Sequence, residues 1–96
     1  MSQDLDIRCR LTPEGFSCEV NVGSDPAATH HTVTVSQDDL ARLAPGHYDP
    51  ERLVEASFEF LLAREPRESI LRTFDLPVIE RYFPGYKARI SAQMGS

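Results

Sequence analysis

The chain has 96 residues, of which 41% are hydrophobic and 26% are charged. A chain of this size and composition forms one ordinary globular domain with a single modest core. The net charge of −5 argues against a protein that binds the phosphate backbone of nucleic acids, because such proteins place Lys and Arg against the phosphates. The sequence shows neither a secretory leader pattern nor an apolar run near the roughly 20 residues needed to span a bilayer, and we therefore expect a cytoplasmic protein.

Two N-terminal segments, at about 4–11 and 16–22, alternate between apolar and polar residues. This period of two is typical of strands with one buried face and one wet face. A Thr-Pro-Glu-Gly turn joins them, and Gly15 can take the left-handed conformation that closes it. Residues opposed on an antiparallel ladder point to the same face, so the hydrophobic pattern and the tight turn together predict a β-hairpin with Cys9 opposite Cys18.

A third strand, at about 30–35, follows a loop rich in Gly, Ser, Asp and Pro. The period changes at Ser36, whose hydroxyl can accept hydrogen bonds from the free amides of a first helical turn. The Asp-Pro pair at 49–50 is a second helix-start signal. Tyr48 and Leu53 stand around it at the spacing of a hydrophobic staple. These signals predict the starts of two helices.

Prolines divide the C-terminal half into short helices, because proline lacks an amide hydrogen and clashes with the preceding turn. The helices are expected at about 37–44, 50–64, 66–73 and 76–83, and residues 91–96 are expected to form a flexible tail. The predicted fold class is α+β, with an N-terminal three-stranded antiparallel β-meander packed against three to four short C-terminal helices. The whole chain is expected to form a single domain.

Three side chains of the predicted sheet, Cys9, Cys18 and His31, are expected on one face. The two cysteines could form a cross-strand disulfide, or two thirds of a metal site that His31 completes. We favour a third interpretation, in which both are free thiols packed as small core residues, because a structural disulfide is not expected in a reducing cytosol. His30 points away from His31, and His47 falls in a loop. Without a catalytic motif or an evident general base, we expect no enzyme, no metal and no cofactor.

Charge is uneven along the chain. Residues 1–63 carry four Arg and eleven Asp or Glu, whereas residues 64–96 carry six basic and four acidic residues. The basic residues of this last third stand among tyrosines, as in surfaces that bind single-stranded nucleic acid. Acidic residues stand close enough to pair with them, so we favour a solvated, salt-bridged face. A nucleic-acid-associated regulator that uses the basic C-terminal third is our alternative hypothesis.

Aromatic residues are crowded between positions 58 and 86, and short helices bury their own sides incompletely. Phe60 also falls off the apolar stripe of its predicted helix. Because aromatic residues and Arg are enriched in protein interfaces, we expect a small non-enzymatic domain that contacts a protein partner or a second copy of itself. The open alternative is that the C-terminal helices cover the aromatics within the monomer. The expected interaction surface comprises Phe60, Arg67, Arg72, Tyr82 and Tyr86.

The C-terminal block AREPRESILRTFDLPVIERYFPGY, together with PERLVEASFEFLL and VTVSQDDLARL before it, resembles a group of short uncharacterised bacterial proteins. That group shares a strand ending in V-x-V, a helix, and a C-terminal block of REPxxSIL, FDL and YFPxY type. The resemblance covers about residues 32–90. It implies a recurrent fold, and because the group has no activity to carry over, it assigns a role to no residue of this chain.

Overall fold

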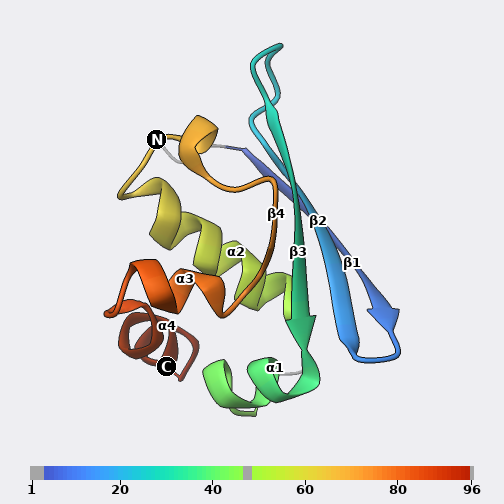
Figure 1. Cartoon of the computed structure of the whole chain (residues 1–96), viewed down its shortest axis with the longest axis vertical. Helices are drawn as coiled ribbons and strands as arrows, with labels where there is room; N and C mark the ends of the chain where they lie inside the picture. Colours follow the sequence, from blue (N-terminus) through green and yellow to red (C-terminus); the bar gives the residue numbers. More distant parts are fainter. Residues whose placement is uncertain (1–3, 47–48, 96) are drawn as a thin grey trace.

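The computed structural model describes residues 4–46 and 49–95 (Figure 1). Three strands come first, and the helices follow with one short strand among them, which confirms the predicted α+β class. The strands are β1 (Leu5–Thr12), β2 (Gly15–Val22), β3 (Thr29–Ser36) and β4 (Thr73–Asp75). The helices are α1 (Gln37–Leu43), α2 (Pro50–Leu62), the 3-10 helix η1 (Arg67–Ser69), α3 (Val78–Tyr82) and α4 (Tyr86–Gly95).

The strands form one mixed sheet in the order β1-β2-β3-β4. The first three are antiparallel neighbours, and each lies within one residue of its predicted bounds. The ladder sets Cys9 opposite Cys18 and Leu5 opposite Val22, which confirms the register that the hydrophobic alternation predicted. The sequence did not predict β4, which pairs parallel to β3 and makes the sheet four-stranded.

Capping residues start the first two helices where the sequence predicted them. Ser36 Oγ accepts a hydrogen bond from the Asp39 amide at 3.0 Å, and the Asp39 carboxylate accepts one from the Ser36 amide at 3.3 Å. The two residues therefore form a capping box. Asp49 accepts a hydrogen bond from the Glu51 amide at 3.0 Å, and a proline holds the first position of α2. Tyr48, one half of the predicted hydrophobic staple, lies outside the described residues.

Helix α2 lies at the centre of the molecule, between the sheet and the C-terminal helices (Figure 1). On its sheet side, the Phe58 ring lies 5.3 Å from the ring of His31 in β3 and 6.2 Å from that of Phe74 in β4, measured between centroids. On its other side, the Phe60 ring lies 5.3 Å from that of Tyr86 in α4. A single core therefore runs on both sides of α2.

The helix predicted at 66–73 is wrong. The chain makes only the single turn η1 there and then extends into β4. The prediction depended on Pro66 as a helix start and on the apolar pair Ile70 and Leu71, of which Ile70 is buried and Leu71 is exposed. The Thr32 amide donates to the Arg72 carbonyl at 2.6 Å. Pairing with β3 thus supplies hydrogen bonds that a further helical turn would have formed.

The end of the chain is more ordered than the sequence indicated. The helix predicted at 76–83 is shorter, because α3 begins only after a proline and spans five residues. The tail expected to be flexible at 91–96 is helical as far as α4 extends, and the last residue lies outside the described part. Tyr86, Ile90 and Met94 stand four residues apart and are all buried. This stripe packs α4 against α1, α2 and α3, which explains the order.

Candidate functional site

A surface hollow of about 410 Å³ lies where the end of α2, η1, β4 and α3 meet. We call it the C-terminal groove and define it by five of its lining residues, Leu61, Glu65, Leu71, Phe74 and Tyr82. In Figure 1 the chain leaves α2, makes η1, runs along the sheet edge as β4 and turns into α3, so these elements frame one area. Apart from Glu65, the side chains that line the groove are uncharged and mostly apolar.

Exposed hydrophobic side chains are concentrated at this groove. In the described part of the chain three large hydrophobic side chains are exposed: Leu71 at 51%, Tyr82 at 69% and Leu11 at 72%. Leu71 and Tyr82 both line the C-terminal groove, whereas Leu11 lies apart from it on β1. Burial of apolar surface is favourable by about 25 cal/mol of free energy for each Å² removed from water. Two such side chains beside an apolar hollow therefore mark a candidate binding site.

The structure divides the interaction surface that the sequence predicted. Tyr82 is exposed, but Phe60 is only 6% exposed and Tyr86 is fully buried, so the placement of these two at the surface is wrong. The ring of Phe60 packs edge-on against those of Phe83 and Tyr86. The guanidinium carbon of Arg64 lies 3.6 Å from the centre of the Phe60 ring. For these aromatics, the alternative of cover within the monomer is therefore confirmed.

Tyr86 has a structural role inside the protein. The Ser57 hydroxyl donates to the Leu53 carbonyl at 2.7 Å, so the Tyr86 hydroxyl donates to Ser57 Oγ, 2.5 Å away. Burial raises the pKa of Tyr86, and the hydrogen bond with Ser57 acts in the opposite direction. A phenol held protonated among core side chains satisfies a buried polar pair and does not offer a proton to a ligand.

The two predicted arginines of the surface differ in their environment. Arg67 is 14% exposed and holds the loop after β2: its guanidinium donates to Asp25 Oδ1 at 3.0 Å and to the Val22 carbonyl at 3.4 Å. Arg72 is exposed between η1 and β4. The basic C-terminal third is thus partly used for internal contacts, because Arg64 also donates to the Phe60 carbonyl at 2.9 Å. Nucleic-acid binding by this third stays a prediction.

His31 is buried and supports one wall of the C-terminal groove. Its Nδ1 donates to the Leu71 carbonyl at 2.8 Å, so Nε2 accepts from the Thr29 hydroxyl at 2.9 Å. Burial lowers the pKa of His31, the positive charge of Arg72 and that of His30 lower it further, and the Leu71 carbonyl opposes them. A neutral imidazole therefore joins β3 to the segment that leads into β4.

This arrangement predicts a pH dependence of folding that arises at one histidine. The unfolded chain binds a proton at His31 with the ordinary histidine pKa of about 6.5, while the folded chain binds it less readily. The contribution of His31 to stability is therefore fully present above about pH 6.5 and is lost as the pH falls from there toward the lower pKa of the folded state. We expect a smaller free energy of unfolding in urea at pH 6.0 than at pH 7.5, and His31→Gln should reduce this difference. His30→Gln removes only the last of the influences on the pKa of His31 and should change the difference less. An equal loss of the difference in both variants would contradict the assignment.

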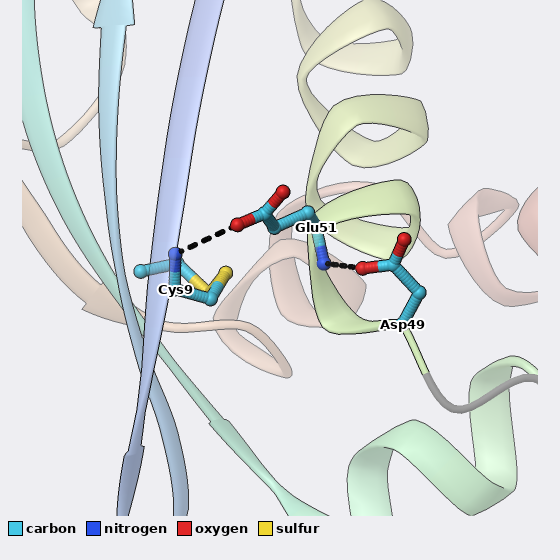
Figure 2. Close-up of a disulfide and its surroundings, with 4 residues drawn as sticks. Cys9, Asp49 and Glu51 are labelled. Atoms are coloured by element: carbon cyan, nitrogen blue, oxygen red, sulfur yellow. Dashed lines mark hydrogen bonds between the residues drawn. A yellow bond between two sulfur atoms is a disulfide. The ribbon is translucent and has the colours of Figure 1, made fainter.

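Cys9 and Cys18 form a disulfide, so the prediction of two free thiols is wrong. That prediction depended on the expected compartment, whereas the register places the two residues directly opposite each other with their Cα atoms 4.0 Å apart. Figure 2 shows the neighbouring contact: Glu51 at the start of α2 reaches β1, where its Oε2 accepts from the Cys9 amide at 3.2 Å. The Cys9 amide, on an edge strand of the sheet, therefore donates its hydrogen bond to a carboxylate of α2.

The disulfide is expected to stabilise the fold by about 2–3 kcal/mol, because it closes a short loop in the unfolded chain. A reductant should therefore lower the melting temperature of the native protein. The double variant Cys9→Ala, Cys18→Ala should melt at the lower temperature with or without reductant. Thiol titration should show free thiols only in the reducing buffer. If the native protein then melts at the same temperature in oxidising and in reducing buffer, this expectation is contradicted.

No cluster of three His, Cys, Asp or Glu side chains that could hold a metal ion occurs in residues 4–46 and 49–95. The site considered from the sequence is not assembled, because Cys9 and Cys18 bond to each other and both ring nitrogens of His31 are hydrogen-bonded within the protein. His47 lies outside the described residues. Within the described part, the helices are too short and too polar for any of them to cross a bilayer.

The fold is that of a small α+β domain whose four-stranded mixed sheet is covered by helices on one side. Comparison with known protein families, with curated proteins and with solved structures finds no match to this chain. The resemblance to short bacterial proteins stays a prediction. Function must therefore be argued from the C-terminal groove itself.

Proposed function

We propose that this protein is a small non-enzymatic interaction domain that binds an apolar segment of a protein partner in the C-terminal groove. The observation that carries the proposal is the exposure of Leu71 and Tyr82 in the lining of a mostly apolar hollow. An aromatic residue and an aliphatic residue of this kind are typical anchors of protein interfaces. A partner side chain that fills the hollow would remove both from water.

The C-terminal groove is built on well-supported elements. Its floor includes Leu61, which is buried in α2, and Phe74, whose ring packs beside that of Phe58. The main chain at Leu71 is held by the buried ring of His31. A site that is already formed binds with a smaller ordering cost than one that must be assembled. The fold thus supports recognition by a fixed surface.

The proposal is tested by selecting ligands from a display library of random eight-residue peptides on the immobilised protein. We expect enriched peptides with apolar anchors, and we expect Leu71→Asp and Tyr82→Asp each to weaken their binding at least about tenfold, as for interface anchors. Both side chains are largely exposed, so these variants should keep the fold, which circular dichroism checks.

Leu11→Asp is the matched control, because Leu11 is a leucine outside the groove that is even more exposed than Leu71. It should leave peptide affinity within about twofold of the native value, as expected for an independent surface site. The proposal fails when no peptide is enriched, or when Leu11→Asp weakens the selected peptides as much as Leu71→Asp does.

A further inference from the structure

The outer edge of β4 is free. The Thr32 amide donates to the Arg72 carbonyl at 2.6 Å, and the Leu76 amide donates to the Thr34 carbonyl at 2.9 Å. In a parallel ladder, alternate residues turn their main-chain groups toward opposite sides of the strand, so the amide and carbonyl groups of Thr73 and Asp75 point away from β3. In the described part of the chain no strand pairs with β4 on that side.

The C-terminal groove lies beside this free edge, on the helix side of the sheet. The side chain of Phe74 is buried and lines the groove, whereas those of Thr73 and Asp75 are exposed on the other face. Alternate side chains of a strand point to opposite faces. An added strand next to β4 would therefore direct every second side chain over the groove and leave the others in water.

The opposite edge of the sheet differs. On β1 the Cys9 amide is already bonded to the Glu51 carboxylate (Figure 2), so a side chain from α2 occupies this outward group. No such side chain is bonded to the outward main-chain groups of Thr73 or Asp75 in the described residues. Helix α2 thus packs on the β1 side of the sheet, whereas β4 contributes to the C-terminal groove, so a segment bound in the groove lies next to the β4 edge.

Charge adds a further constraint on the ligand. Glu65 is the single charged residue in the lining of the C-terminal groove, and within the described residues it belongs to no ion pair. The two arginines nearest to it in sequence make other contacts: Arg64 lies against the Phe60 ring, and Arg67 pairs with Asp25 and Glu68. The Glu65 carboxylate is therefore free to attract a cationic group of a ligand.

We propose that the ligand is an extended segment of a partner protein, which pairs as a fifth strand with Thr73 and Asp75, places alternate apolar side chains in the C-terminal groove and directs a Lys or Arg to Glu65. Strand addition of this kind takes affinity from main-chain hydrogen bonds and specificity from side-chain pockets. The inference depends on the proposed function, and adds to it the conformation and the charge of the ligand.

The charge is tested with the same display library on Glu65→Lys, with Glu59→Lys as the control on an exposed position of α2 outside the groove. We expect Lys or Arg at one position of the peptides selected by the native protein and by the control, and Asp or Glu at that position after selection on Glu65→Lys. Peptides that require Leu71 and Tyr82 but show no such exchange would overturn this part and leave the proposed function standing.

Strand addition is tested with a synthetic peptide of the selected sequence, methylated at single main-chain nitrogens. Methylation should weaken binding at least tenfold at alternate positions, where the amides face β4, and should change it less than twofold at the positions between. Equal effects at all positions, or none, would overturn the extended conformation. Light scattering tests whether the native protein associates with itself. Self-association that Leu71→Asp abolishes would identify a second copy of the chain as the occupant of the groove, and would overturn the proposal of a segment from a partner protein.

Discussion

Replacing Phe58 with alanine is expected to lower the free energy of unfolding by about 3–5 kcal/mol. The side chain is fully buried, and its ring contacts His31 of β3 and Phe74 of β4. Truncation removes the transfer free energy of the ring and leaves a cavity between α2 and the sheet that rigid neighbours fill only in part. Small domains are stable by only about 5–15 kcal/mol, so urea unfolding should show a large fall in midpoint.

Tyr82→Ala is the matched control for this experiment. It removes an aromatic ring of similar size from a helix, but that ring is mostly exposed, so the change should stay within about 0.5 kcal/mol. Similar losses for the two variants would contradict the central position of α2 in the core. The control also separates stability from binding, because Tyr82 is expected to matter for the ligand and not for the fold.

Gly15→Ala is the second change with a large expected effect, a loss of roughly 3 kcal/mol or more, because a well-packed site cannot accept added atoms. A Cβ at Gly15 would meet the main chain where β3 passes into α1: the Val35 carbonyl oxygen, the Cα of Ser36 at 2.7 Å and the Gln37 nitrogen at 2.9 Å. Main-chain atoms of a paired strand and a capped helix cannot move aside without breaking their own hydrogen bonds. Thermal unfolding should show a fall of about 12 °C or more.

Gly85→Ala provides the comparison, because a Cβ built there has nothing within 4 Å. Its effect on the melting temperature should be small, since a surface substitution with free space typically changes stability by less than about 0.5 kcal/mol. If the two alanine variants have the same melting temperature, the close approach of the hairpin turn to the β3–α1 junction is not present in solution.

The N-terminal half was predictable because its signals are local and mutually consistent. The alternation of apolar residues in β1 and β2 admits one register with the short turn, and that register is observed. Ser36 and Asp49 cap α1 and α2 as predicted, since a cap depends only on residues within one helical turn. Even here the reason for Gly15 was incomplete: the sequence indicated a turn glycine, and the structure shows that the passing chain leaves no space for a Cβ.

The site was less predictable, because burial depends on contacts distant in sequence. Phe60 lies off the apolar stripe of an isolated amphipathic helix, but α2 is covered on two sides and buries it. The spacing of Tyr86, Ile90 and Met94 was a signal for α4, although only three apolar residues carry it. The exposure of Tyr82 agrees with the expected interaction surface. That of Leu71, which lies between η1 and β4, was not indicated by any local pattern.

By itself the sequence determined the α+β class, three antiparallel strands with their register, and the starts of the first two helices, because each of these follows from neighbouring residues and one buried face. Only the tertiary structure decided that Thr73 to Asp75 form a fourth strand, that α2 lies between two layers, and that the cysteines are joined. A three-residue segment with one buried side chain is too short to show the alternation of apolar and polar residues by which a strand is predicted. Its hydrogen bonds come from a strand some 40 positions earlier, and so the groove beside it exists only in the folded chain.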